Sequence, residues 1–401
     1  MAEIVERDVT IDAKVPKSQR ILTFDLLRGF FLLVIMIDHI ELYPNLFDFF
    51  TGKGRLWVSA AEGFFFMSGL LIGMMYKRRL HLGMKFIFKK MWKRAAELYV
   101  AGVGFTFLYL AWVEFTHHAP IKDALPSPFP WHHYIGQALL MRFTYGWADF
   151  LVRFAILMFF APFVFYVIAK GRWWLALAGI WLIWAFRGQG FTLAWQLIFN
   201  LGMLIGYYWQ PIRVKFNQLK PPARNLIKRG FLIAGVATFA LSYASVYVLS
   251  LLFHLWGDDR LPAAWQHIAY DWGNWNHDVW IYADKWTMGP LRVALFFIWF
   301  PVIYGLFRRF ERPLSRYSHG LLELLGRNSL FVYSAHSVII FSLKMYLIPS
   351  QTNLLQNFLI TGLGLVLLVS ITKLYVHFRP ALAGIRLPIL NWRTGGARPS
   401  S

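Results

Sequence analysis

Four ionisable side chains lie in one otherwise apolar stretch near the start of the chain. The stretch reads FDLLRGFFLLVIMIDH, residues 24–39, and carries Asp25, Arg28, Asp38 and His39. An imidazole titrates near about 6.5 when unperturbed, so His39 can accept a hydroxyl proton at neutral pH as a general base. A charge at the centre of a bilayer helix costs about 3 kcal/mol, so these four groups are candidates for function.

The spacing of these residues predicts a shared face. At the pitch of an α-helix, Arg28 and His39 point in nearly the same direction and lie about 16 Å apart along the axis. Each therefore lies near a different membrane surface, as in a site reached from both sides. Asp38 lies a quarter turn from His39, so contact between its carboxylate and the His39 ring cannot be assumed.

A second apolar stretch, WVSAAEGFFFMSGLLIGMM, contains Glu62 as its one charge. Glu62 shares an arc with Gly69 and Gly73, a small-xxx-small pair typical of a seam between packed helices. The carboxylate is therefore expected on the packed face, where it can meet Arg28 or His39. It would act there as a structural ion pair with Arg28, or as the group that orients His39.

A third stretch, LGRNSLFVYSAHS, places Ser329, Tyr333 and His336 within one narrow arc of a helix. These side chains could be polar contacts between helices or could contact substrate and stabilise an oxyanion. Arg327 lies at the cytoplasmic end, where it could extend to the lipid headgroups. We predict that Asp25, Arg327 and the three helix residues contact donor or substrate.

An exterior segment, DWGNWNHDVWIYADKW, alternates tryptophans with carboxylates and amides. Aromatic residues beside a membrane commonly form an interfacial belt. The same alternation also suits carbohydrate, because rings stack on the apolar faces of sugars and polar groups bind hydroxyls. We therefore predict that Trp275 and Trp280 contact substrate. The histidine pairs at 117–118 and 132–133 predict no metal site, because adjacent residues on a helix do not face one ligand position.

The elements that position these residues follow from composition. The 401 residues are 58% hydrophobic and 15% charged, against about 25% charged in soluble domains, which predicts an all-α polytopic membrane protein. Ten spans are expected, at about 21–43, 56–76, 95–115, 148–169, 173–187, 193–210, 230–256, 291–309, 325–348 and 358–378. The domain organisation is a cytoplasmic segment 1–20 without a signal peptide, a transmembrane domain 21–378 and a cytoplasmic tail 379–401.

Most of the 41 lysines and arginines fall in the termini and in alternate loops of this layout. The positive-inside rule then places both termini in the cytoplasm. The net charge of +21 is thus a signal of topology, and no nucleic-acid partner is implied. Cysteine is absent, which excludes disulfides, thiolate nucleophiles and cysteine-ligated metals.

Three motifs together resemble the OpgC family, part of a wider superfamily of membrane acyltransferases that includes acyltransferase family 3 and the lysosomal heparan glucosaminide acetyltransferases. The first motif is R-x4-D-x2-R-G-x8-D-H, which runs from Arg20 to His39 and includes Gly29. The second is AAEGFFFMSG at 60–69, and the third is LGRNSLFVY-x2-H at 325–336.

The resemblance implies a membrane O-acyltransferase of the bacterial inner membrane. Such proteins move an acyl group, succinyl or acetyl, from cytoplasmic acyl-CoA to a hydroxyl of an extracytoplasmic glycan, and OpgC is associated with succinylation of periplasmic glucans. It also implies that His39 is the catalytic base, and Arg28 matches the family's arginine; with Asp38 and Glu62 they form our predicted catalytic set. No permanently bound cofactor is expected, and the partners are acyl-CoA, glycan, the lipid bilayer and, as an open alternative, further copies of the chain.

Two other classes of function fit the same residues. A proton-coupled transporter would also place Asp25, Arg28, Glu62 and His39 in the membrane, and it predicts solute flux without consumption of acyl-CoA. A flippase or scaffold partner for glycan export would use the polar residues only as contacts between helices. That function predicts that His39 can be replaced by Asn or Gln without consequence.

Overall fold

The computed structural model describes residues 21–116, 131–248, 275, 277–348 and 353–382. Within these ranges the chain forms helices and turns and no strand, which confirms the all-α prediction. The helices are α1 (Leu22–Ile40), α2 (Asp48–Thr51), η1 (Gly52–Gly54), α3 (Ala60–Arg78), η2 (Leu80–Leu82), α4 (Met84–Thr116), α5 (Trp131–Leu139), η3 (Gly146–Ala148), α6 (Asp149–Ala169), α7 (Trp173–Ala185), η4 (Arg187–Gln189), α8 (Phe191–Tyr207), α9 (Trp209–Gln218), α10 (Pro221–Tyr243), η5 (Ala244–Val248), α13 (Pro290–Arg309), α14 (Glu311–Tyr317), α15 (Leu321–Arg327), α16 (Ser329–Tyr346) and α17 (Leu354–Leu382).

Five stretches are long and apolar enough to cross a membrane: Met84–Thr116, Gly146–Ala169, Pro221–Tyr247, Pro290–Arg309 and Leu354–Pro380. The chain is therefore a membrane protein, as the composition predicts. Each of the ten predicted spans overlaps a helix. The count of ten and the cytoplasmic location of both termini stay predictions, as do the terminal segments, since residues 1–20 and 383–401 lie outside the described residues.

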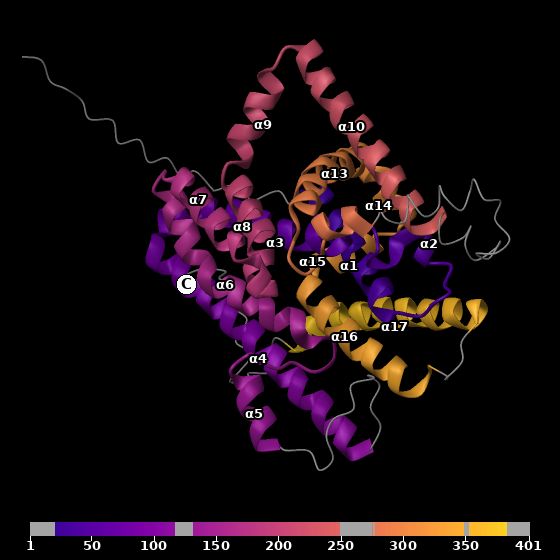
Figure 1. Ribbon diagram of the computed structural model, residues 1–401. Coiled ribbons are helices and arrows are strands. Elements are labelled where there is room, and N and C mark those ends of the chain that lie inside the picture. Colours follow the sequence, from indigo (N-terminus) through magenta and orange to yellow (C-terminus); the bar gives the residue numbers. More distant parts are fainter. Residues whose placement is uncertain (1–20, 117–130, 249–274, 276, 349–352, 383–401) are drawn as a thin grey trace, which may run out of the picture.

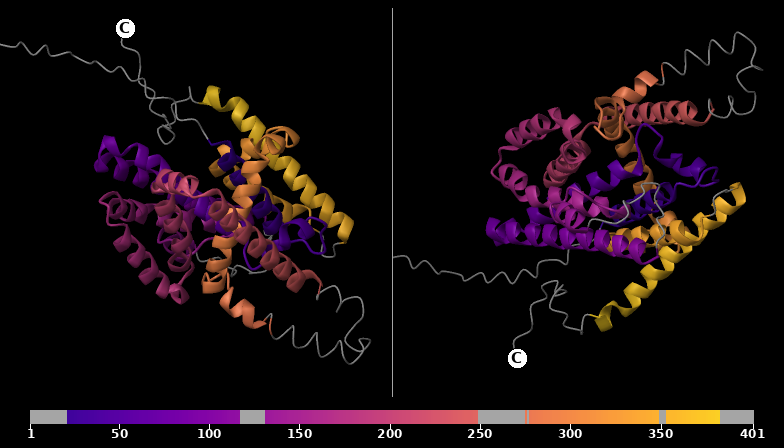
Figure 2. Two further views of the ribbon diagram at one scale, coloured as in Figure 1. Left: turned by 90° about the horizontal axis from the view of Figure 1, so that it is seen from above. Right: turned by 60° about the horizontal axis from the view of Figure 1, so that its bottom comes forward.

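Helix α1 lies in the middle of the molecule. It packs against α3, α13, α15, α16 and α17. In Figure 1 and in both views of Figure 2, the magenta helices α6 to α8 and the yellow helix α17 lie on opposite sides of the molecule. The stretch with four ionisable groups is thus surrounded by protein on several faces, where polar side chains can find partners.

Two glycines bring α1 and α15 into backbone contact. A Cβ atom added at Gly29 would lie 1.9 Å from the Leu322 carbonyl oxygen, and one added at Gly326 would lie 1.9 Å from the Asp25 carbonyl oxygen. No other residue fits at either position without moving a backbone. The crossing therefore depends on one glycine from the first motif and one from the third, and it sets the spacing of the polar side chains beside it.

The predicted seam at Gly69 and Gly73 is confirmed, and its partner is α8. Added Cβ atoms at these glycines would lie 1.9 Å and 2.1 Å from backbone carbonyl oxygens of α8. Helix α8 supplies its own small-xxx-small pair, Gly202 and Gly206, which face the backbone of α3 in the same way. This second pair did not figure in the prediction, although its four-residue spacing is visible in the sequence.

The predicted ninth span is two helices. Asn328 has φ −110° and ψ 29°, outside the helical region, and separates α15 from α16. Its side-chain amide donates to the Leu324 carbonyl oxygen at 2.8 Å, which occupies a carbonyl at the end of α15. The break leaves Arg327 at the end of α15, whereas Ser329, Tyr333 and His336 belong to α16.

Candidate functional site

Two histidines from distant parts of the chain meet between α1 and α16. His39 Nδ1 lies 3.2 Å from His336 Nε2, and the ring planes are inclined by only 27°. The ring centroids are 5.5 Å apart, which exceeds the distance between the two nitrogens by about two ring radii. The rings therefore lie edge to edge, with the two nitrogens directed at each other, as a hydrogen bond requires.

The two histidines differ in accessibility. His336 is 2% exposed, whereas His39 is half-buried in the last turn of α1. His336 Nδ1 also contacts the Tyr333 carbonyl oxygen, one turn earlier in α16. His336 therefore has both ring nitrogens engaged inside the protein, and His39 is the member of the pair that a substrate can reach.

Tyr333 packs beside this pair. Its ring lies 4.3 Å from the His336 ring in an edge-to-face arrangement and 4.3 Å from the Phe150 ring in a stacked one. The side chain is 1% exposed, and its hydroxyl has no hydrogen-bond partner among the described residues. A buried hydroxyl without a partner costs about 1–3 kcal/mol, so Tyr333 retains a donor at a cost to stability.

Arg28 meets the same helix. Its Nη2 donates to Ser329 Oγ at the first residue of α16. Since Arg28 and His39 both contact α16, the prediction that they share a face is confirmed. The earlier residue of α1, Arg28, contacts the first residue of α16, and the later one, His39, contacts a later residue, His336. Helices α1 and α16 therefore run in the same direction.

Asp25 and Arg327 also come together, as an ion pair with 3.2 Å between Arg327 Nε and Asp25 Oδ2. The Arg327 side chain is 48% exposed and that of Asp25 is 14% exposed. The contacts Asp25–Arg327, Arg28–Ser329 and His39–His336 follow one another along α1. We call this series the polar seam; it joins one end of α1 to the other through α15 and α16.

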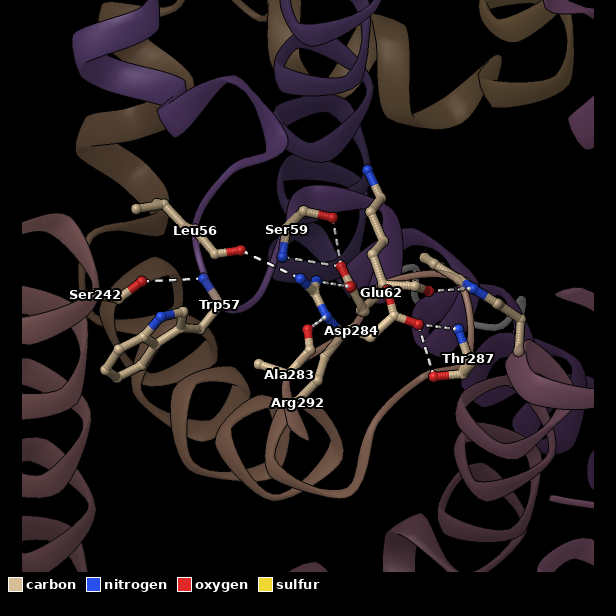
Figure 3. A network of polar contacts seen from close by, with 11 residues as sticks. Leu56, Trp57, Ser59, Glu62, Ser242, Ala283, Asp284, Thr287 and Arg292 are labelled. Atoms are coloured by element: carbon tan, nitrogen blue, oxygen red, sulfur yellow. Dashed lines mark hydrogen bonds and ion pairs between the residues drawn. The ribbon is translucent and has the colours of Figure 1, made fainter. Parts of the chain in front are cut away.

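Glu62 lies elsewhere, and the expected contact with Arg28 or His39 is wrong. Its Oε1 lies 2.5 Å from Arg292 Nη1, and neither side chain is exposed. Its Oε2 accepts hydrogen bonds from the Ser59 backbone N–H at 2.9 Å and the Ser59 hydroxyl at 2.6 Å, a capping box at the start of α3 (Figure 3). Arg292 Nε donates to the Ala283 carbonyl oxygen at 2.7 Å. The carboxylate thus joins three segments and orients no imidazole in this arrangement.

Arg292 falls within the predicted span 291–309 but was not among the predicted site residues. The available signal was that Arg292 is a lone cation at the start of an apolar span, just as Glu62 is a lone anion at the start of another. Burying each charge alone would be costly, so the two satisfy one another.

Among the described residues, the Asp38 carboxylate forms no hydrogen bond with the His39 ring. A Cβ added at Gly54 would lie 3.7 Å from Asp38 Oδ2 and 3.4 Å from Lys285 Nζ, so the carboxylate and the ammonium both border η1. The other carboxylate oxygen, Oδ1, is buried and has no hydrogen-bond partner among the described residues. The structure therefore gives Asp38 a place beside the site but no contact with the imidazole.

The aromatic segment 271–286 is described only in part, because residues 249–274 and 276 lie outside the described ranges. Trp275 is 39% exposed and packs edge-to-face on Trp57, with 5.8 Å between ring centroids. Trp280 is half-buried. A hollow of about 500 Å³ lies beside Trp275 and is lined by Trp275, Asp278, Val279, Tyr282, Pro290 and Leu291. Among the described residues, no cluster of three or more His, Asp or Glu side chains could hold a metal ion.

These observations define a helical membrane protein with a polar seam between α1 and the α15–α16 pair, ending in the contact between His39 and His336. The profile of the family described as OpgC protein matches residues 20–379, so the chain belongs to the OpgC family. The comparison with curated proteins gives no match. The comparison with solved structures gives none either.

Proposed function

We propose that this chain is an O-acyltransferase of the bacterial inner membrane. It would move an acyl group, succinyl or acetyl, from cytoplasmic acyl-CoA to a hydroxyl of an extracytoplasmic glycan. Membership in the OpgC family supports the class. The observation that carries the proposal is His39, a half-buried imidazole whose Nδ1 is 3.2 Å from a buried histidine at the end of the polar seam.

The donor would approach along the polar seam. Its phosphates would pair with the exposed end of Arg327 and with neighbouring cations such as Arg308, whose side chain is 49% exposed. The acylated pantetheine arm would then lie along α1 past Arg28. The distance from Arg28 to His39 along the helix is about 16 Å, a length that an extended arm can cover.

His39 would act as general base. It takes the proton of a sugar hydroxyl while the oxygen attacks the thioester carbonyl carbon. The C–S bond then breaks, and the CoA thiolate leaves and takes the proton from the imidazolium. The tetrahedral intermediate needs a hydrogen-bond donor for its oxyanion. Ser329 and Arg28 bond to each other, so the unpartnered hydroxyl of Tyr333 is the candidate we prefer.

The glycan would bind on the exterior side, where Trp275 offers an exposed ring and Asp278 a carboxylate beside the 500 Å³ hollow. Rings of this kind stack on the apolar faces of sugars. Trp280 would support the same surface.

The test uses the full chain in liposomes, with acetyl-CoA and succinyl-CoA offered separately and release of free CoA thiol measured. Turnover with one donor, abolished in His39→Ala and retained in His132→Ala, is the expected result. His132 is an exposed histidine on α5 and controls for the loss of an imidazole. Solute flux without consumption of either donor would overturn the proposal in favour of a transporter.

A further inference from the structure

We propose that His336 is a positioning residue that fixes the tautomer of His39. It holds the proton of His39 on Nδ1 and so leaves Nε2 as the basic nitrogen. Two hydrogen bonds connect the three groups involved: the Tyr333 carbonyl oxygen, the His336 ring and the His39 ring. Its catalytic meaning rests on the proposed function, but the tautomer itself can be measured without any turnover.

The direction of these two hydrogen bonds follows from donor and acceptor chemistry. A backbone carbonyl oxygen can only accept, so the contact between Tyr333 O and His336 Nδ1 places a proton on that nitrogen. A neutral imidazole carries one proton, so His336 Nε2 has a lone pair. His39 Nδ1 lies 3.2 Å away and must then donate. The proton of neutral His39 is therefore on Nδ1, and Nε2 is free to take a proton from a substrate.

The surroundings of His39 Nε2 agree with this assignment. No described residue forms a hydrogen bond with His39 Nε2. This nitrogen is also not among the fully buried polar atoms without a partner, so it is accessible. His336, in contrast, is 2% exposed and fixed from within its own helix by the carbonyl three residues earlier. The buried imidazole thus orients, and the accessible one is left to react.

Among the described residues, no carboxylate accepts a hydrogen bond from His39 Nδ1. Glu62 is occupied by Ser59 and Arg292, and Asp38 borders η1 beside Lys285. A neutral imidazole is also cheaper to bury than a carboxylate, which would need a charged partner. When His39 takes a proton, its Nδ1–H becomes a charge-assisted donor, and the bond to His336 strengthens. His336 therefore stabilises the imidazolium without carrying a charge in the ground state.

The test is ¹⁵N NMR of histidine-labelled full chain in lipid or detergent, with the His39 signals assigned by their loss in His39→Gln. We expect His39 to be protonated on Nδ1 and unprotonated on Nε2. In His336→Leu the partner is gone, and the signals should shift to the Nε2–H tautomer that isolated histidine favours. In His336→Gln the amide oxygen can accept from His39 while the amide N–H₂ donates to the Tyr333 carbonyl, so the original tautomer should persist.

Kinetics add a second readout. His336→Leu should lower kcat on the order of 10²- to 10⁴-fold with KM for acyl-CoA nearly unchanged, as expected when a base is held in the wrong tautomer. His336→Gln should stay within about tenfold of the parent. Ser337→Ala is the matched control, because Ser337 is equally buried on α16 but bonds to Tyr109. It should change neither readout.

Any of these results would overturn the inference: Nε2 protonation of His39 in the parent chain, an unchanged tautomer in His336→Leu, or full kcat in that variant. A Gln variant that keeps the tautomer but loses kcat as completely as the Leu variant would do the same. If the tautomer behaves as expected while neither acyl-CoA is consumed, the proposed function fails and the histidine assignment stands.

Discussion

Arg292 Nη1 lies 2.5 Å from Glu62 Oε1, and neither side chain exposes any surface. The pair joins the start of α13 to the start of α3, and Arg292 also holds the Ala283 carbonyl of the loop before α13. It lies near Trp57, whose backbone N–H donates to the Ser242 hydroxyl at 3.0 Å (Figure 3). This network connects the starts of α3 and α13 with the last turn of α10.

Removal of one partner of this pair should strongly destabilise the protein. Arg292→Met leaves the Glu62 carboxylate buried without its cation, which should cost about 3–5 kcal/mol. The double variant Glu62→Gln with Arg292→Met should recover a large part of that loss, because no uncompensated charge remains. Reversible unfolding in mixed micelles measures both. Additive effects of the two substitutions would contradict the ion pair.

Alanine at Gly326 should disturb the crossing of α1 and α15. The added Cβ would lie 1.9 Å from the Asp25 carbonyl oxygen, so a backbone must move, at a cost of about 1–3 kcal/mol or more. Gly104→Ala on α4 is the matched control, because nothing lies within 4 Å of its added Cβ. The control should be neutral or slightly stabilising. Equal melting temperatures for the two variants would argue against the crossing.

Arg327→Ala should weaken binding of the donor. If the guanidinium pairs with a phosphate of acyl-CoA, KM for the donor should rise about tenfold while kcat stays nearly constant. The ion pair with Asp25 is half-exposed, so the melting temperature should change little. Arg312→Ala removes another exposed cation of the same region and serves as control. A fall in kcat at constant KM would place Arg327 outside the donor site.

Tyr333→Phe should separate activity from stability. Loss of a hydrogen-bond donor to an oxyanion lowers kcat on the order of 10²- to 10³-fold. The same change removes a buried hydroxyl without a described partner, so the free energy of unfolding should hold or rise by about 1 kcal/mol. Thermal unfolding and thiol release on one preparation test both effects. A variant with normal kcat and a lower melting temperature would show that the hydroxyl is a structural contact.

Local sequence patterns predicted much of this arrangement. The excess of apolar residues over charged ones predicted a helical membrane protein. Backbone polar groups in a bilayer core find no water, and a helix satisfies them within its own segment. Helical periodicity placed Arg28 and His39 on one face, and it grouped Ser329, Tyr333 and His336 on one arc. These are properties of a single helix, and the 3.6-residue repeat is enough to define them.

The tertiary structure decided which faces meet. His39 and His336 are 297 positions apart, and Glu62 and Arg292 are 230 apart, so no local repeat relates them. The packing of α1 against α16 gave His39 a histidine as its partner and left Glu62 to Arg292. Side-chain pairing between helices depends on their crossing and rotation, and for α1 and α15 the close crossing requires Gly29 and Gly326. The sequence by itself determined which polar side chains share a helix face, and only the packing of the helices decided which of these faces meet.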